Sequence, residues 1–70
     1  MSFDVSNEVK KELLIRRIEQ LNLEGYQHEL SKKLAEARED LSAVEESNKA
    51  IEFVISALEV AQTELSTLED

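Results

Sequence analysis

The sequence of 70 residues contains no cysteine, no proline and no tryptophan, and its single glycine is Gly25. Without cysteine the chain has neither a disulfide nor a thiolate metal site, the usual staples of small domains. Self-association is therefore the obvious remaining source of stability. Little in the chain interrupts a helix, and helix-favouring residues such as glutamate, leucine, alanine and lysine dominate it. The composition predicts one small all-α domain.

Long apolar runs are also missing. No stretch of about 18 apolar residues occurs, so we expect no segment that spans a bilayer. Residues 1–4 (MSFD) have neither the basic nor the apolar region of a secretory signal. We therefore expect an intact, soluble, cytoplasmic protein.

Positive charge is scarce in the second half of the chain. The formal net charge is −8. Residues 1–38 contain seven acidic and seven basic side chains, whereas residues 39–70 contain nine acidic side chains and only Lys49. Nucleic acids and anionic membranes are bound by clusters of Lys and Arg. We therefore expect no direct contact with nucleic acid or membrane, and we expect self-association and a further protein partner, with a basic one among the candidates.

A seven-residue repeat runs through residues 30–65. Its members follow one another at alternating spacings of four and three, and they are Leu30, Leu34, Ala37, Leu41, Val44, Asn48, Ile51, Ile55, Leu58, Gln62 and Leu65. This spacing places their side chains along one seam of a helix, as in coiled coils. Asn48 is a polar member of the seam, and it either sets the register or lies at a wet edge of a bundle.

The first candidate for a turn is the segment 40–43. Residues 42–45 (SAVE) have the form of a capping box, with a serine followed three residues later by a glutamate. A turn here pairs residue 41+k with residue 41−k, so that Ile51 meets Leu30 or the residue after it. Such pairing covers the apolar residues at both ends of the chain.

The second candidate is the segment 24–26, where Gly25 would end a helix in the left-handed conformation. A turn there leaves residues 48–68 with no partner in the same chain. We therefore favour a single-domain antiparallel α-helical hairpin with coiled-coil heptads, with helices at about 6–39 and 43–68. A single uninterrupted helix is the third alternative.

The apolar face of the first helix changes between Leu21 and Leu30. At 100° per residue, Leu14, Ile18 and Leu21 centre on one side of the helix. The residues that centre on nearly the opposite side are Leu23, Tyr26, Leu30, Leu34 and Ala37. Either the chain turns at Gly25, or a continuous helix contacts two partners, one on each side.

Residues 50–61 (AIEFVISALEVA) are apolar on most sides of a helix. The polar members are Glu52, Ser56 and Glu59, while Phe53, Ala57 and Val60 form a second apolar stripe beside the seam. Such a helix is typically buried among several helices, so we expect hairpins to self-associate into a helical bundle. The expected interface consists of Leu30, Leu34, Leu41, Val44, Ile51, Phe53, Val54, Ile55, Leu58, Val60 and Leu65.

Residues that could carry chemistry are few. His28 is the only histidine, and Glu24 is the one carboxylate a helical turn before it. One histidine and one carboxylate do not make a metal site. The chain has no glycine-rich phosphate loop and no nucleophile–histidine–acid set. We therefore expect no metal, no cofactor and no enzymatic activity.

These observations favour a non-enzymatic interaction protein, such as an assembly factor, an adaptor or a structural subunit. The alternative is an acidic inhibitor that occupies the basic nucleic-acid-binding surface of a target protein. In composition and repeat the chain resembles short acidic coiled-coil proteins of bacteriophages, including tail-fibre assembly chaperones. This resemblance rests on no specific motif, and we do not assign the chain to that family.

Overall fold

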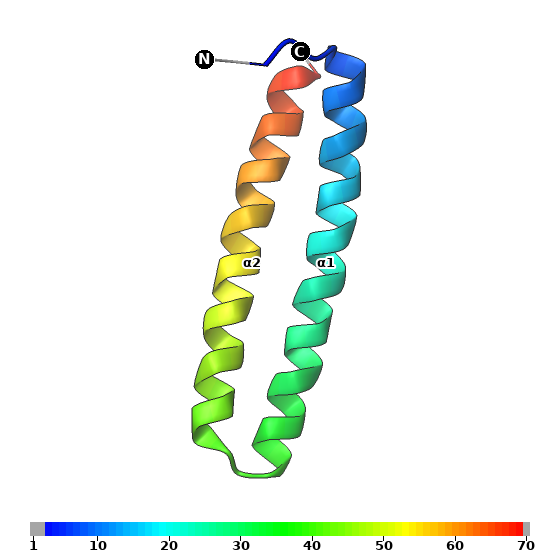
Figure 1. Cartoon of the computed structure of the whole chain (residues 1–70). Coiled ribbons are helices and arrows are strands. Elements are labelled where there is room, and N and C mark those ends of the chain that lie inside the picture. The colour runs from blue at the N-terminus through cyan, green and yellow to red at the C-terminus, as the bar shows by residue number, and fades with distance from the viewer. Residues whose placement is uncertain (1–2, 70) are drawn as a thin grey trace.

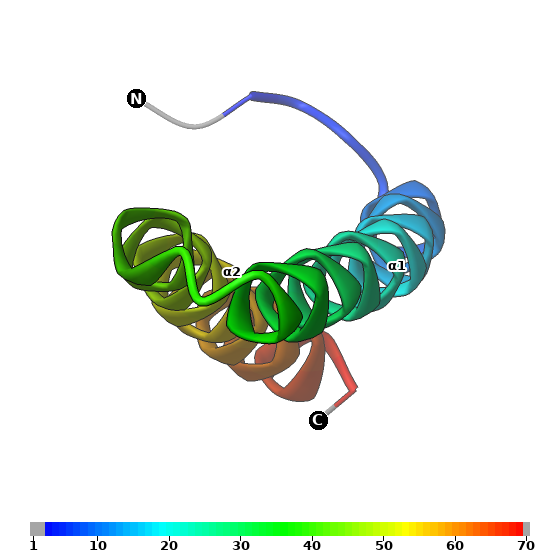
Figure 2. The ribbon, with the colours of Figure 1, turned by 90° about the horizontal axis from the view of Figure 1, so that it is seen from below.

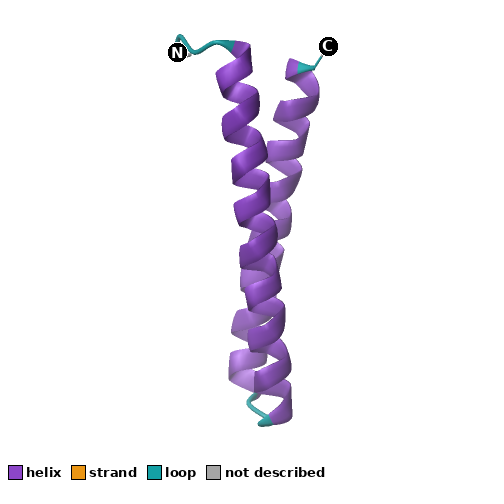
Figure 3. Ribbon diagram, turned by 90° about the vertical axis from the view of Figure 1, so that its right-hand side faces the viewer, coloured by secondary structure: helices purple, strands orange, loops and turns teal. Residues whose placement is uncertain are grey.

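Two α-helices lie side by side in the computed structural model, which describes residues 3–69. Helix α1 spans Asn7–Ala37 and helix α2 spans Leu41–Leu68. The chain folds back at residues 38–40, so the start of α1 and the end of α2 lie at one end of an elongated hairpin (Figure 1). The hairpin measures 49 × 20 × 18 Å. Its helices cross at a shallow angle (Figure 2 and Figure 3). The predicted all-α antiparallel hairpin is confirmed.

Helix α1 begins after a serine whose side-chain oxygen can accept a hydrogen bond from a free backbone amide of the first turn. The backbone N–H of Val9 donates to Oγ of Ser6 at 3.3 Å, which makes Ser6 the N-cap. Glu8 places a carboxylate in the same turn, where the positive end of the helix dipole stabilises it.

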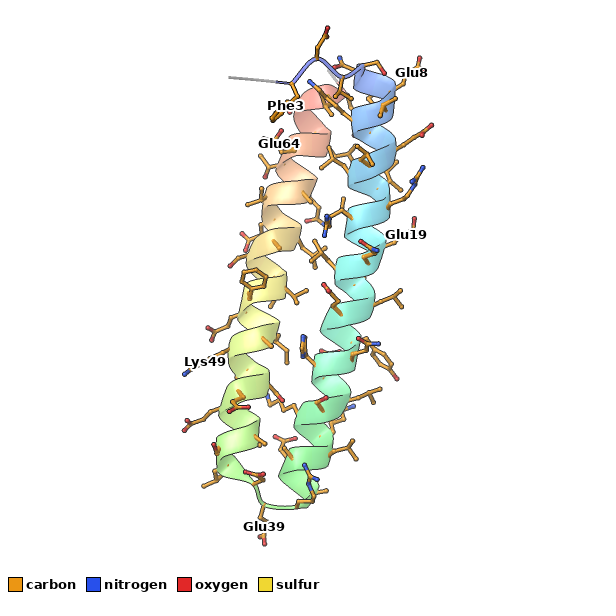
Figure 4. The ribbon with its side chains drawn as sticks, in the orientation of Figure 1. Phe3, Glu8, Glu19, Glu39, Lys49 and Glu64 are labelled. Atoms are coloured by element: carbon orange, nitrogen blue, oxygen red, sulfur yellow. The ribbon has the colours of Figure 1, made fainter. Side chains whose placement is uncertain are left out.

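The end of α1 is closed by two backbone hydrogen bonds. The N–H of Asp40 donates to the carbonyl of Ala35 at 2.9 Å, and the N–H of Glu39 donates to that of Glu36 at 3.1 Å. This pair of bonds forms a Schellman motif. Glu39 adopts the left-handed conformation (φ 58°), which Gly25 does not. Glu39 marks the tip of the turn (Figure 4).

Asp40 also begins α2. Its Oδ1 accepts a hydrogen bond from the N–H of Ala43 at 3.1 Å, and its carbonyl accepts one from Val44 at 3.0 Å. The turn is thus shorter and earlier than the predicted segment 40–43, and Ser42 lies inside α2 rather than at its cap. Asp40 supplies the cap two residues before Ser42 could, because the Schellman motif has already reversed the chain there.

Helix α1 runs through Gly25 without a break. The alternative turn at 24–26 and the single uninterrupted helix are therefore both wrong. Gly25 is half-buried, and a Cβ placed on it would lie 3.4 Å from Cγ1 of Val54. The expected register of 41+k beside 41−k is also wrong, because it places Val54 beside His28. The compact turn shifts α1 by three residues, almost one helical turn.

The seam between the helices follows from this register. Half-buried Lys10, Ala43, Asn48, Ala50 and Ala57 lie at its edges. Its central positions, all buried or half-buried, recur at spacings of three and four residues. On α1 they are Lys11, Leu14, Ile18, Leu21, Gly25, His28, Lys32 and Ala35. On α2 they are Val44, Ser47, Ile51, Val54, Leu58, Ala61, Leu65 and Leu68. Large apolar side chains occupy the end near the termini, while small or polar ones occupy much of the α1 side near the turn.

We expect Gly25→Ala to stabilise the hairpin. Alanine in a helix interior is favoured over glycine by about 0.5–1 kcal/mol, and the added methyl group would meet Val54 at van der Waals distance. Urea unfolding at a fixed chain concentration should show a rise of that size in the free energy of unfolding. Gly25→Leu, which is too large for this position, should lower it. A loss of stability in Gly25→Ala would mean that Val54 cannot move aside.

We expect Asp40→Ala to destabilise the hairpin and Ser42→Ala to leave it nearly unchanged. Removing an N-cap side chain typically costs about 1 kcal/mol. Asp40→Asn should retain most of the stability, because its side-chain oxygen can still accept the hydrogen bond from Ala43. Thermal melts of the three variants measure the difference. A larger loss in Ser42→Ala than in Asp40→Ala would contradict the position of the cap.

Candidate functional site

The hairpin buries little of its apolar surface. The buried side chains of the described residues are Leu21, Ala35, Val54 and Ala61, and two of these are alanine. Exposed large apolar side chains are far more numerous. They are Phe3, Val5, Val9, Leu13, Ile15, Leu23, Tyr26, Leu30, Leu34, Leu41, Phe53, Ile55 and Val60. The candidate functional site is therefore a set of exposed apolar surfaces rather than a cavity.

The first surface lies on the side of α1 that faces away from α2. Leu23, Leu30 and Leu34 share this side and are exposed; we call them the outer stripe. Leu30 is roughly 180° around the helix from buried Leu21. The change of apolar face in the sequence therefore reflects one continuous helix with two apolar sides. The first side contacts α2, and the second has no partner among the described residues.

The second surface is a groove between the two helices. Leu21, Gly25 and Tyr26 line it from α1, while Ile51, Ile55 and Leu58 line it from α2. We call it the Tyr26–Ile55 groove. Its side chains are graded from buried Leu21 at the floor to exposed Tyr26 and Ile55 at the two rims. Because Gly25 has no side chain, the floor of the groove stays open at that position.

The opposite side of the hairpin is chemically different. The hollow between the helices there is lined mainly by polar or charged side chains, together with Ala43 and Ala50. The polar and charged members are His28, Ser31, Arg38, Glu46 and Ser47. The flank that carries the groove also becomes charged nearer the turn, where a further hollow is lined by Glu29, Lys32, Lys33, Glu36, Asn48 and Ile51. The apolar lining is therefore confined to the Tyr26–Ile55 groove.

A third exposed apolar surface lies on α2. Phe53 and Val60 are seven residues apart, two helical turns, and are 74% and 65% exposed. We call them the Phe53–Val60 patch. The hairpin itself does not cover this patch, so burial of Phe53 between chains stays a prediction.

The eleven residues predicted to form an interface fall into three classes. Val54 is buried inside the hairpin. Val44, Ile51, Leu58 and Leu65 are half-buried along the seam between the helices. The exposed ones are Leu30, Leu34, Leu41, Phe53, Ile55 and Val60. One edge of the seven-residue repeat on α2 therefore packs against α1, and its other edge faces solvent.

Tyr26 and Gly25 were not among the predicted site residues, although both line the groove. Tyr26 was visible in the sequence as a member of an apolar stripe. Its position beside Ile55 depends on the register between the helices, which the sequence pattern misjudged by three residues. The sequence predicted Gly25 only as a possible turn residue. No sequence pattern indicated that it lies at the floor of the groove.

Charged side chains lie mainly on the outside of the hairpin. Glu45, Glu52 and Glu59 follow one another at seven-residue spacing on α2, and all three are exposed. Glu19 and Lys49 point away from the neighbouring helix (Figure 4). Within residues 3–69, a single ion pair occurs, between exposed Arg16 and Glu12 at 3.8 Å.

His28 is half-buried at the seam, beside the polar hollow. Across the described part of the chain, no three histidine, aspartate or glutamate side chains cluster in a way that could hold a metal ion. Neither helix, as far as the structure describes them, contains an apolar stretch long enough to cross a membrane.

Comparisons with known proteins leave the chain without a family. No model of a protein family matches the sequence, and searches of curated proteins and of solved structures find no significant similarity.

We expect the intrachain role of Val54 to appear in a matched pair of substitutions. Val54→Ala removes buried methyl groups and should lower the free energy of unfolding by about 1–3 kcal/mol. Val60→Ala makes the same change at an exposed site and should lower it by less than about 0.5 kcal/mol. Urea denaturation of both variants measures the difference. Equal losses would mean that the Phe53–Val60 patch is also buried in solution.

Proposed function

We propose that this chain is a non-enzymatic interaction protein that acts through self-association and helix–helix contacts. Assembly factors, adaptors and small structural subunits are the roles that fit this description. The proposal has one main support, which is the amount of apolar surface that the hairpin leaves in water.

The accessible surface of the hairpin is 5838 Å². A compact monomer of 8.0 kDa is expected to expose about 4,450 Å², so the elongated hairpin exposes roughly 1,400 Å² more in total, polar and apolar surface together. Large contiguous apolar surface on a soluble protein commonly marks an interaction site. The exposed leucines of α1 and the rims of the Tyr26–Ile55 groove contribute to this excess. Contact with further helices is the direct way to remove it from water.

The alternative function, an acidic inhibitor of a nucleic-acid-binding protein, is favoured by the glutamates of α2. Glu45, Glu52 and Glu59 form an exposed acidic column, and each lacks a basic partner among residues 3–69. Such a column could face a basic groove. Salt distinguishes the two functions, because charge-driven binding weakens steeply with ionic strength and apolar contact does not.

We expect the purified chain to be larger than a monomer. Light scattering during size-exclusion chromatography at micromolar concentration should give a mass that is a multiple of 8.0 kDa. The mass should persist at high salt, because apolar contacts are not screened. A strictly monomeric chain over the whole accessible concentration range would contradict self-association.

A further inference from the structure

We propose that two copies of this chain exchange helices. Each chain straightens at residues 38–40 into one continuous helix, and the two helices pair antiparallel along a shared apolar row. A lone chain remains the hairpin, and the extended form exists only within the pair. This inference rests on the proposed self-association, and it names the partner, the surface and the segment that changes conformation.

The apolar row is a sequence pattern that continues through the turn. It recurs every seven residues, and we call it the long row: Val9, Arg16, Leu23, Leu30, Ala37, Val44, Ile51, Leu58 and Leu65. Arg16 is its one polar member. The spacing from Ala37 to Val44 is also seven, although the turn lies between them. A seven-residue period that persists on both sides of a turn is typical of a continuous helix that supercoils around a partner.

The hairpin divides the long row into a covered half and an exposed half. Its members on α2, such as Ile51 and Leu58, are half-buried against α1. Its members Leu23 and Leu30 on α1 are 66% and 43% exposed. Further exposed side chains lie four residues after members of the row, and they are Leu13, Leu34, Leu41 and Ile55. In a straightened chain, the exposed leucines of α1 would continue the surface that α2 already uses for packing.

The charges beside the long row select a second copy in antiparallel orientation. The residue after each member of the long row belongs to what we call the charged row: Lys10, Arg17, Glu24, Ser31, Arg38, Glu45, Glu52, Glu59 and Ser66. With the exception of Glu24, the charges up to residue 38 are positive, and those after it are all negative. In an antiparallel pair the two charged rows run in opposite directions, so the basic half of one faces the acidic half of the other. In a parallel pair in register, Arg38 would approach Lys33 and Glu45 would approach Asp40, which is repulsive.

One antiparallel alignment matches the apolar members of the two chains. The numbers of facing residues then have a constant sum, so placing Leu34 beside Val44 of the second chain also places Leu23 beside Ile55 and Leu13 beside Leu65. Arg16 faces Gln62 in this alignment, a polar side chain beside another. Gln20, Gln27 and Asn48 face apolar side chains, and polar groups at such positions lower the stability of a coiled coil. The pair should therefore be reversible.

The turn itself can become helical. Residues 38–40 are Arg, Glu and Asp, so neither proline nor glycine prevents a helix there. Glu39 has a positive φ of 58°, a conformation that is unfavourable for a residue with a Cβ atom and that straightening would relieve. Short, strained connections favour exchange of helices between copies.

Chain concentration decides which form is present. Straightening separates the seam of the hairpin and uncovers Leu14, Ile18 and Leu21, while pairing covers Leu23, Leu30 and Leu34. The hairpin needs one chain and the exchanged form needs two. Mass action therefore favours hairpins in dilute solution and exchanged pairs in concentrated solution.

The test measures a distance within one chain. Asn22 and Ser56 are exposed and lie on different helices, and the chain has no cysteine of its own. Spin labels on an Asn22→Cys, Ser56→Cys chain should lie close to the 20 Å width of the hairpin. In the straightened chain they should be about 51 Å apart, at about 1.5 Å per residue. Dilution of the labelled chain into an excess of unlabelled chain restricts the measurement to distances within one chain.

We expect the long distance to appear as the total chain concentration rises, together with an increase in mass from 8.0 kDa to twice that value. A mass that doubles while the labels stay near 20 Å would overturn the exchange and leave the proposed self-association intact. A mass of 8.0 kDa throughout, at either distance, would overturn both.

The orientation is measured with two singly labelled chains, one carrying Asn22→Cys and the other Ser56→Cys. These two positions face each other in the antiparallel alignment, so the labels should be close together in the mixed pair. A separation of about 51 Å would indicate a parallel pair and would overturn the antiparallel exchange.

Substitutions at Glu39 test the straightening independently. Glycine adopts a positive φ freely and disfavours a helix, whereas alanine does the reverse. The dissociation constant of the pair should therefore be at least about 100-fold higher for Glu39→Gly than for Glu39→Ala, because both chains straighten. Glu46→Gly and Glu46→Ala are the matched control, since exposed Glu46 is helical in both forms, and they should differ far less. Equal dissociation constants for the two Glu39 variants would overturn the straightening.

Discussion

Asp40 constrains the rest of the structure, because it ends one helix and begins the next. Its backbone N–H closes the last turn of α1 on Ala35, and its carboxylate caps α2 through Ala43. Because Asp40 both closes α1 and caps α2, the connection between the helices is as short as these hydrogen bonds allow. The relative height of the two helices is then set, and Val54 lies beside Gly25. This register determines which faces of the two helices are covered.

The register divides the apolar residues of α1 unequally. Leu14, Ile18 and Leu21 turn toward α2 near the termini, whereas Gly25 and Ala35 occupy the same seam nearer the turn. Small residues let the helices come close but bury little hydrocarbon. The larger side chains of that part of α1, among them Leu30 and Leu34, face outward. A hairpin built in this way gains limited stability from its own seam, which is the physical reason for proposing contact between chains.

The register also decides which side chains line the hollows on the two flanks of the hairpin. The groove with Tyr26 and Ile55 is apolar, while the hollow with Arg38 and Glu46 on the other flank is charged. Nearer the turn, Lys32 and Glu36 make the first flank charged as well. Acidic side chains such as Glu52 cover the outside of α2. The proposed function uses this difference, because an apolar surface can attract a partner while charged surfaces stay hydrated.

Helix content and the existence of the hairpin could be read from local chemistry. No proline interrupts the chain, the seven-residue repeat marks a helical seam, and a turn near residue 40 is the one that covers the apolar residues at both ends of the chain. These features act over one or two turns, so the order of residues is enough to reveal them. The site was only partly readable: Ile51, Ile55 and Leu58 were predicted, whereas Tyr26 and Gly25 were not. The register and the groove arise from contacts between segments far apart in the chain. Glu39, and not the lone glycine, took the left-handed position of the turn, because closing α1 on Ala35 and capping α2 with Asp40 together outweigh the modest strain of a non-glycine residue there.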